Sequence, residues 1–151
     1  MNYEKWLVPV DEKYINKLNG YDKLWYLIKE TRDQVKSDEA HVAYLFYKLK
    51  GYSDSLIKEI SNLWNRLNVE YVDECFEVLT EDFCSESTVK EFSNWLILRG
   101  EEVYDIFKNR GAKGVKGYII KSGIDNTDDE ATHLGSEIMG EFLDLIRGIE
   151  S

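Results

Sequence analysis

The stretch Thr88-Val-Lys-Glu-Phe-Ser-Asn-Trp-Leu-Ile-Leu-Arg-Gly-Glu-Glu-Val-Tyr-Asp-Ile-Phe107 contains the signals that decide the fold. Its Thr88-x-x-Glu91 spacing is a capping-box pattern, which predicts that a helix starts here. Gly100 predicts the end of that helix, and a second short helix is expected over residues 101–109. Side chains recur at helical intervals between these signals and are expected to be buried: Val89, Phe92, Trp95, Leu96 and either Leu98 or the stem of Arg99.

Helical periodicity extends over most of the remaining chain. It predicts helices over residues 22–36, 39–50, from Ser53 or Asp54 to 67, and 69–80, with Gly51 ending the second in the C′ position. A second capping box, Thr127-x-x-Glu130, predicts a long final helix. The sequence therefore predicts an all-α single domain over residues 1–151, a bundle of about six or seven short helices.

Two segments are predicted to lie outside these helices. Residues 1–20 are expected to be extended or irregular, because Pro9 cannot occupy a helix interior. The segment 108–126 is expected to be a loop rich in lysine and glycine, since residues 108–123 contain four glycines.

Composition favours a cytoplasmic protein. No apolar run approaches the roughly 18 residues that a membrane span needs, and the N-terminal run is too short for a signal peptide. Cys75 and Cys84 are expected to be free thiols in a reducing cytosol, although a disulfide between them stays open.

Charge is unevenly distributed along a chain whose net charge is −10. Residues 67–92 carry eight acidic side chains against Lys90 alone, and residues 122–151 carry eight against Arg147. Such a surface repels nucleic acid and anionic membranes and speeds the encounter with a basic protein. The alternative is that these acids serve solubility only. The candidate partner-binding residues are Glu70, Asp73, Glu74, Glu77, Glu81, Asp82, Glu86, Asp128 and Asp129.

Both histidines follow an acidic residue at helical spacing, in Asp38-x-x-His41 and Glu130-x-x-His133. Helical di-metal proteins use two Glu-x-x-His units, so a small metal-dependent enzyme is one alternative, with these four side chains converging. Both units lie in a first helical turn, however, where acids are expected for capping reasons. We therefore predict no metal, no other cofactor and no catalytic residue.

The segment Phe92-Ser-Asn-Trp95-Leu-Ile97-Leu-Arg-Gly100-Glu-Glu102-Val-Tyr104 resembles the bacterial family known as domain of unknown function 4240. That family has a signature close to Phe-x-x-Trp-Leu-Ile-x-x-Gly-x-Glu-Val-Tyr, and its opening helix is similar to Leu24-Trp-Tyr-Leu-Ile28. The chain departs from the family in Asp82-Phe-Cys-Ser-Glu-Ser87 and in the lysine-glycine run. The resemblance implies an α-helical domain and brings no catalytic residues with it.

Small acidic proteins of this style are similar to immunity proteins of bacterial toxin systems. The sequence therefore favours a non-catalytic acidic binding protein, of the immunity or antitoxin type, that neutralises a basic bacterial toxin domain. Besides the metal-dependent enzyme, one further alternative is a structural homo-oligomeric subunit in which Trp6, Trp25 or Tyr44 cover a homodimer face.

Overall fold

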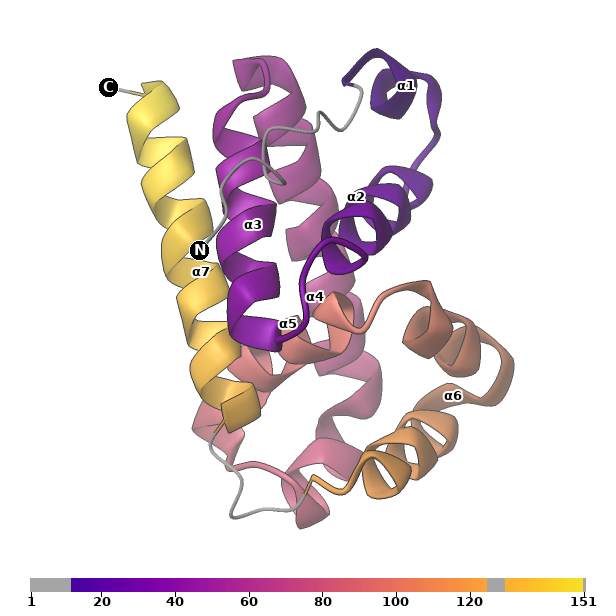
Figure 1. Cartoon of the computed structure of the whole chain (residues 1–151). Coiled ribbons are helices and arrows are strands. Elements are labelled where there is room, and N and C mark those ends of the chain that lie inside the picture. Colours follow the sequence, from indigo (N-terminus) through magenta and orange to yellow (C-terminus); the bar gives the residue numbers. More distant parts are fainter. Residues whose placement is uncertain (1–11, 125–129, 151) are drawn as a thin grey trace. The chain divides into compact units, whose positions relative to one another are not determined.

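A computed structural model describes residues 12–124 and 130–150, and these residues contain α-helices and one short 3₁₀ helix but no strand (Figure 1). The prediction of an all-α protein is therefore confirmed. The elements are α1 (Glu12–Lys17), α2 (Asp22–Arg32), α3 (Asp38–Lys50), α4 (Asp54–Asp82), η2 (Glu86–Thr88), α5 (Val89–Leu98), α6 (Glu101–Ser122) and α7 (Glu130–Glu150).

The chain divides into two compact units, and the division falls inside helices. Unit 1 contains Met1–Trp64 and Gly140–Ser151, and unit 2 contains Asn65–Met139. Because α4 and α7 run across these limits, each of them contributes one part to unit 1 and the other part to unit 2.

The core of unit 1 is built on aromatic contacts and on one buried lysine. The ring of Phe142 lies edge-on to Phe46 at 4.8 Å and tilted against Trp64 at 5.3 Å, in agreement with the neighbouring ribbons of α3 and α7 in Figure 1. Lys23 is 5% exposed, and its ammonium group donates to the carbonyl oxygens of Ile15 and Asn16 at 3.0 and 3.3 Å. It thereby satisfies carbonyls near the C-terminal end of α1.

The core of unit 2 contains helix α5. All five apolar residues predicted to be buried in α5 are at most 4% exposed, so that prediction is confirmed. Helix α5 packs on α6. The ring of Tyr71 on α4 lies 5.0 Å from that of Phe107 on α6.

The structure corrects the predicted break between residues 67 and 69, because α4 is one helix of 29 residues. Asparagine in a helix interior commonly competes with the backbone for hydrogen bonds. Asn68 instead donates to the Lys90 carbonyl oxygen at 2.9 Å and to Asn94 Oδ1 at 2.8 Å. Since these partners lie on α5, the asparagine leaves the backbone of α4 intact.

The predicted lysine- and glycine-rich loop over 108–126 is wrong for the residues that the structure describes there. Helix α6 continues to Ser122, and its path bends at Gly111, whose φ of 67° and ψ of −157° are not helical. Gly123, with φ 84°, ends the helix in the left-handed conformation that glycine adopts readily. Gly111 therefore bends the helix, and Gly123 ends it.

Three smaller predictions about helix ends are also corrected. Residues 12–17, within the segment expected to be irregular, form α1. The Thr88 side chain makes no capping bond; its hydroxyl donates to the Ser85 carbonyl oxygen at 3.0 Å. Gly51 follows α3 as predicted, but its φ of −89° is not the left-handed C′ geometry. The Thr127 capping box falls outside the described residues.

No helix in the described ranges has both the length and the apolar character needed to cross a membrane.

Candidate protein-binding surface

Five of the predicted binding residues share one side of α4, and we call them the acidic stripe: Glu70, Asp73, Glu74, Glu77 and Glu81. The intervals from Glu70 through Glu74 and Glu77 to Glu81 are four, three and four residues. Asp73 lies three residues after Glu70 and four before Glu77, and this spacing places all five side chains on the same face of a helix. The stripe covers eleven residue steps, or about 16 Å at the helical rise. All five residues belong to unit 2.

Lysines of α6 pair with both ends of the acidic stripe. Lys108 Nζ lies 3.3 Å from Glu70 Oε1, and Lys116 Nζ lies 3.1 Å from Asp82 and 4.0 Å from Glu81. Hydrogen bonds to Glu70 and Asp82 raise the pKa of Lys108 and of Lys116 respectively. The sequence does not predict these pairs, because both lysines fall in the segment 108–126 that is expected to be a loop, where no side of a helix is defined.

The middle of the acidic stripe is exposed. Within the described part of the chain, Asp73, Glu74 and Glu77 have no ion pair, and Glu86 is exposed in η2. Asp128 and Asp129 were also predicted to bind a partner, but they lie outside the described residues. The structure therefore places the acidic residues of α4 together, and the negative charges of Asp73, Glu74 and Glu77 are not neutralised by an ion pair within the described residues.

Apolar side chains flank the exposed carboxylates. Val69 is 54% exposed, and Phe76 is partly exposed on the same side of α4 as Asp73 by helical spacing. An aromatic or aliphatic group beside charged groups is a common composition for a protein-binding surface.

A buried hydrogen-bond chain fixes the backbone beneath this surface. Asn68 on α4 donates to Asn94 on α5, whose own Nδ2 donates to the Gly135 carbonyl oxygen on α7 at 3.1 Å. Both asparagines are at most 3% exposed. These hydrogen bonds connect three helices of unit 2. They cannot be predicted from the sequence, since the residues that they join are far apart along the polypeptide.

The two histidines have different surroundings, and neither supports the metal alternative. His41 is 1% exposed, and its Nε2 lies 2.8 Å from Thr31 Oγ1. His133 is exposed and lies 3.2 Å from Glu137. Among the residues that the structure describes, no three His, Cys, Asp or Glu side chains form a group that could hold a metal ion.

Two of the aromatic residues proposed for a homodimer face are not on the surface. Trp25 is 8% exposed and Tyr44 is 1% exposed, so this part of the alternative is wrong. Trp6 lies outside the described residues.

Both cysteines are free and buried within unit 2. Burial raises the pKa of the Cys75 thiol to about 12, and burial also raises the pKa of Cys84. The Cys84 thiol donates to the Leu79 carbonyl oxygen at 3.5 Å. A thiolate is the reactive form of cysteine, so both thiols are held in their unreactive state.

These thiols predict a loss of stability in alkali. A buried Cys75 stays protonated when the unfolded thiol, with a pKa near the ordinary value of 9.0, has ionised. The contribution of the Cys75 thiol to the unfolding free energy is therefore fully present below pH 9. Above pH 9 it falls by about 1.4 kcal/mol per pH unit, until the thiol of the folded protein ionises too. Between pH 8 and pH 10, the wild type should lose about 1.4 kcal/mol more unfolding free energy than Cys75→Ala, measured by urea denaturation with reductant. Burial lowers the pKa of Lys48, and its effect on the pH dependence of the unfolding free energy is the same in the wild type and in Cys75→Ala. Parallel pH profiles would contradict the expectation.

No family model, curated protein or solved structure matches the chain at a significant level. The resemblance to domain of unknown function 4240 therefore stays a prediction.

Proposed function

We propose that the protein is a non-catalytic binding protein of the immunity or antitoxin type, and that its acidic stripe neutralises a basic bacterial toxin domain. The observation that carries this proposal is the exposed centre of the stripe, where Asp73, Glu74 and Glu77 stand beside Val69 without an ion pair in the described chain. Carboxylates in this arrangement speed the encounter with a basic surface, and the flanking apolar groups supply contacts that persist after docking.

The buried asparagine chain supports the same proposal. A surface that is rigid before binding loses less conformational entropy when the complex forms. The helix that carries the stripe is fixed by side-chain hydrogen bonds to α5, and Glu70 and Glu81 at the two ends of the stripe pair with Lys108 and Lys116. We place this activity in the cytoplasm, where free thiols such as Cys75 and Cys84 persist.

The first experiment identifies the partner and then measures its association rate. Tagged protein is used to capture its partner from the source cells at low and at high salt, and a basic protein captured only at low salt is purified. The triple variant Asp73→Lys, Glu74→Lys and Glu77→Lys should associate at least about tenfold more slowly at low salt, because the steering field is reversed. The difference should shrink at high salt, where such fields are screened.

A matched control separates the acidic stripe from net charge. Reversal of three exposed acids in unit 1, Asp33→Lys, Glu39→Lys and Glu150→Lys, adds the same six charges and changes −10 to −4 as the first variant does. This control should keep most of the association rate and, if the partner is a toxin, most of the neutralisation. Equal slowing by both variants would contradict the assignment of the stripe, and an unchanged rate in both would contradict electrostatic steering altogether.

A further inference from the structure

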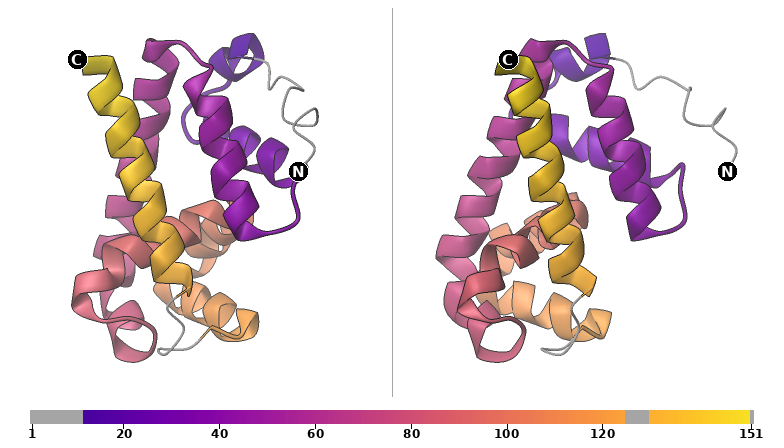
Figure 2. Two further views of the ribbon diagram at one scale, coloured as in Figure 1. Left: turned by 60° about the vertical axis from the view of Figure 1, so that its left-hand side comes forward. Right: turned by 90° about the vertical axis from the view of Figure 1, so that its left-hand side faces the viewer.

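Helix α6 folds back on itself, and the bend creates a hollow on one of its sides. The bend lies at Gly111, and beyond it Gly114 packs against the first arm: a Cβ added there would lie 3.0 Å from Ile106 Cγ2. Figure 2 shows the two arms of α6 (orange) close together. Between them is an open hollow of about 660 Å³, within the range of small-molecule sites in proteins.

The five basic residues of α6 divide between two sides. Lys108 and Lys116 pair with acids of α4, as described above. Arg110, Lys113 and Lys121 lie on the other side, and Arg110 and Lys121 border the hollow together with Glu102, the one acidic residue among the described residues of the lining. The side chains of Arg110, Lys121 and Glu102 therefore give the described lining two positive charges and one negative charge in a protein whose net charge is −10. Such a local reversal of sign concentrates small anions at this place.

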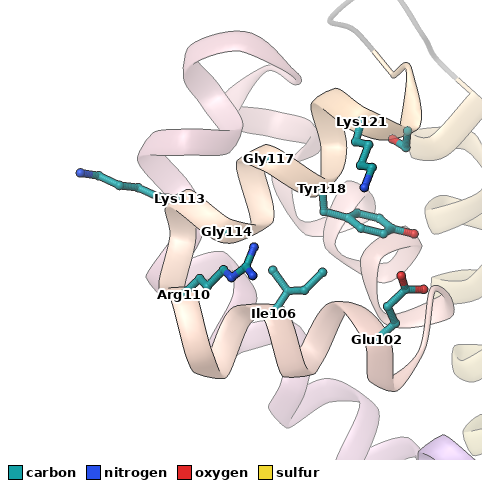
Figure 3. A pocket seen from close by; sticks show the side chains of 9 residues that line it. Glu102, Ile106, Arg110, Lys113, Gly114, Gly117, Tyr118 and Lys121 are labelled. Carbon is teal, nitrogen blue, oxygen red and sulfur yellow. The ribbon is translucent and has the colours of Figure 1, made fainter.

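The lining also offers an apolar surface between its charged groups. Figure 3 shows the Ile106 side chain and the Tyr118 ring in the hollow, with the Arg110 guanidinium near the bend and Lys121 and Glu102 toward the other end. Lys113 points away from the hollow in the same view. No ion pair of Arg110 or Lys121 is present among the described residues.

We propose that this hollow binds a small organic oxyanion, a phosphate monoester or a carboxylate, with a planar or apolar body. The anionic group would contact Arg110, whose planar guanidinium matches the oxygens of phosphate and carboxylate. The body would pack on the Tyr118 ring and Ile106, and Lys121 would add a second positive charge. This site is on α6, outside the acidic stripe, and does not depend on the proposed protein partner.

The test is a titration of the full ¹⁵N-labelled protein, followed by amide chemical shifts. The probes are phenyl phosphate, benzoate, inorganic phosphate and benzyl alcohol. Phenyl phosphate or benzoate should give saturable shifts centred on residues 102–122, and the stronger of the two identifies the anionic group. Inorganic phosphate and benzyl alcohol should bind more weakly, because the first lacks the apolar body and the second lacks the anionic group.

Substitutions test the residues one by one. Arg110→Gln should weaken the binding of the stronger probe about tenfold, since a hydrogen bond between charged groups is lost. Tyr118→Leu should weaken it less and should reduce the preference for phenyl phosphate over inorganic phosphate. Lys113→Gln is the matched control, because it removes the same charge from a side chain that points away. Equal weakening by Lys113→Gln, or the absence of saturable shifts with either organic anion, would overturn the proposal.

Discussion

Gly135→Ala should destabilise the protein by at least about 3 kcal/mol, the largest effect that we expect from any single methyl group in this chain. A Cβ at Gly135 on α7 would overlap the carbonyl oxygen of Glu91 on α5. Backbone atoms cannot move aside as a flexible side chain can, so α5 and α7 would have to separate. The separation would also lengthen the hydrogen bond from Asn94 to the Gly135 carbonyl oxygen.

The matched control for this prediction lies on the same helix. Gly140 is exposed, and a Cβ there would meet no heavy atom within 4 Å. Gly140→Ala should therefore stabilise the protein by roughly 0.5–1 kcal/mol, because alanine is the better helix former. Chemical denaturation of both variants measures the contrast, and a loss of less than about 1 kcal/mol for Gly135→Ala would show that the two helices can adjust at low cost.

Asn94→Ala should cost about 2–4 kcal/mol, because the removed amide is both a donor and an acceptor in a buried position. Asn94 accepts from Asn68 at 2.8 Å and donates to the Gly135 carbonyl oxygen. The truncation leaves the buried Asn68 amide with one partner fewer and removes a bond between α5 and α7. Thermal and urea denaturation would measure the loss.

Ser93→Ala is the control for the removal of a polar group from the same helix. Ser93 is 0% exposed, and its hydroxyl oxygen has no hydrogen-bond partner among the described residues. Its loss should change stability by less than about 1 kcal/mol, in either direction. A Ser93→Ala variant as unstable as Asn94→Ala would indicate that packing in α5, and not the hydrogen-bond chain, dominates the cost.

The helices that can be predicted from the sequence are those with a clear apolar period and a clear start. Helix α5 is an example, since Val89, Phe92 and Trp95 recur at intervals of three, although the structure buries every residue from Phe92 to Leu98. Predictions from the local sequence were wrong where tertiary contacts stabilise a helix that the local residue types do not favour. The predicted break between residues 67 and 69 is absent, and the partners of Asn68 on α5 remove its competition with the backbone. The glycines of α6 read as a loop, yet the close approach of Gly114 to Ile106 holds a second helical arm in place.

The candidate surface was predictable only in part, for a related reason. Spacing along a helix is enough to place Asp73, Glu74 and Glu77 on one side of α4. The neutralisation of Glu70 and Asp82 depends on lysines 38 and 34 positions further along the chain, which a local pattern cannot connect to them. The hollow in α6 depends on a bend at Gly111 that local propensity treats as the end of helical structure.

The continuity of α4 and α7 across both units has a consequence for anyone who wishes to dissect the molecule. A fragment containing only Asn65–Met139 would start in the interior of one helix and stop in the interior of another. Each cut would leave about four backbone groups without their helical partners and would remove the turn that stiffens the remaining end. The chain has no linker at these places, so unit 2 is compact but cannot be separated from the rest of the protein without cutting two helices. Binding studies of the acidic stripe therefore require the full-length polypeptide.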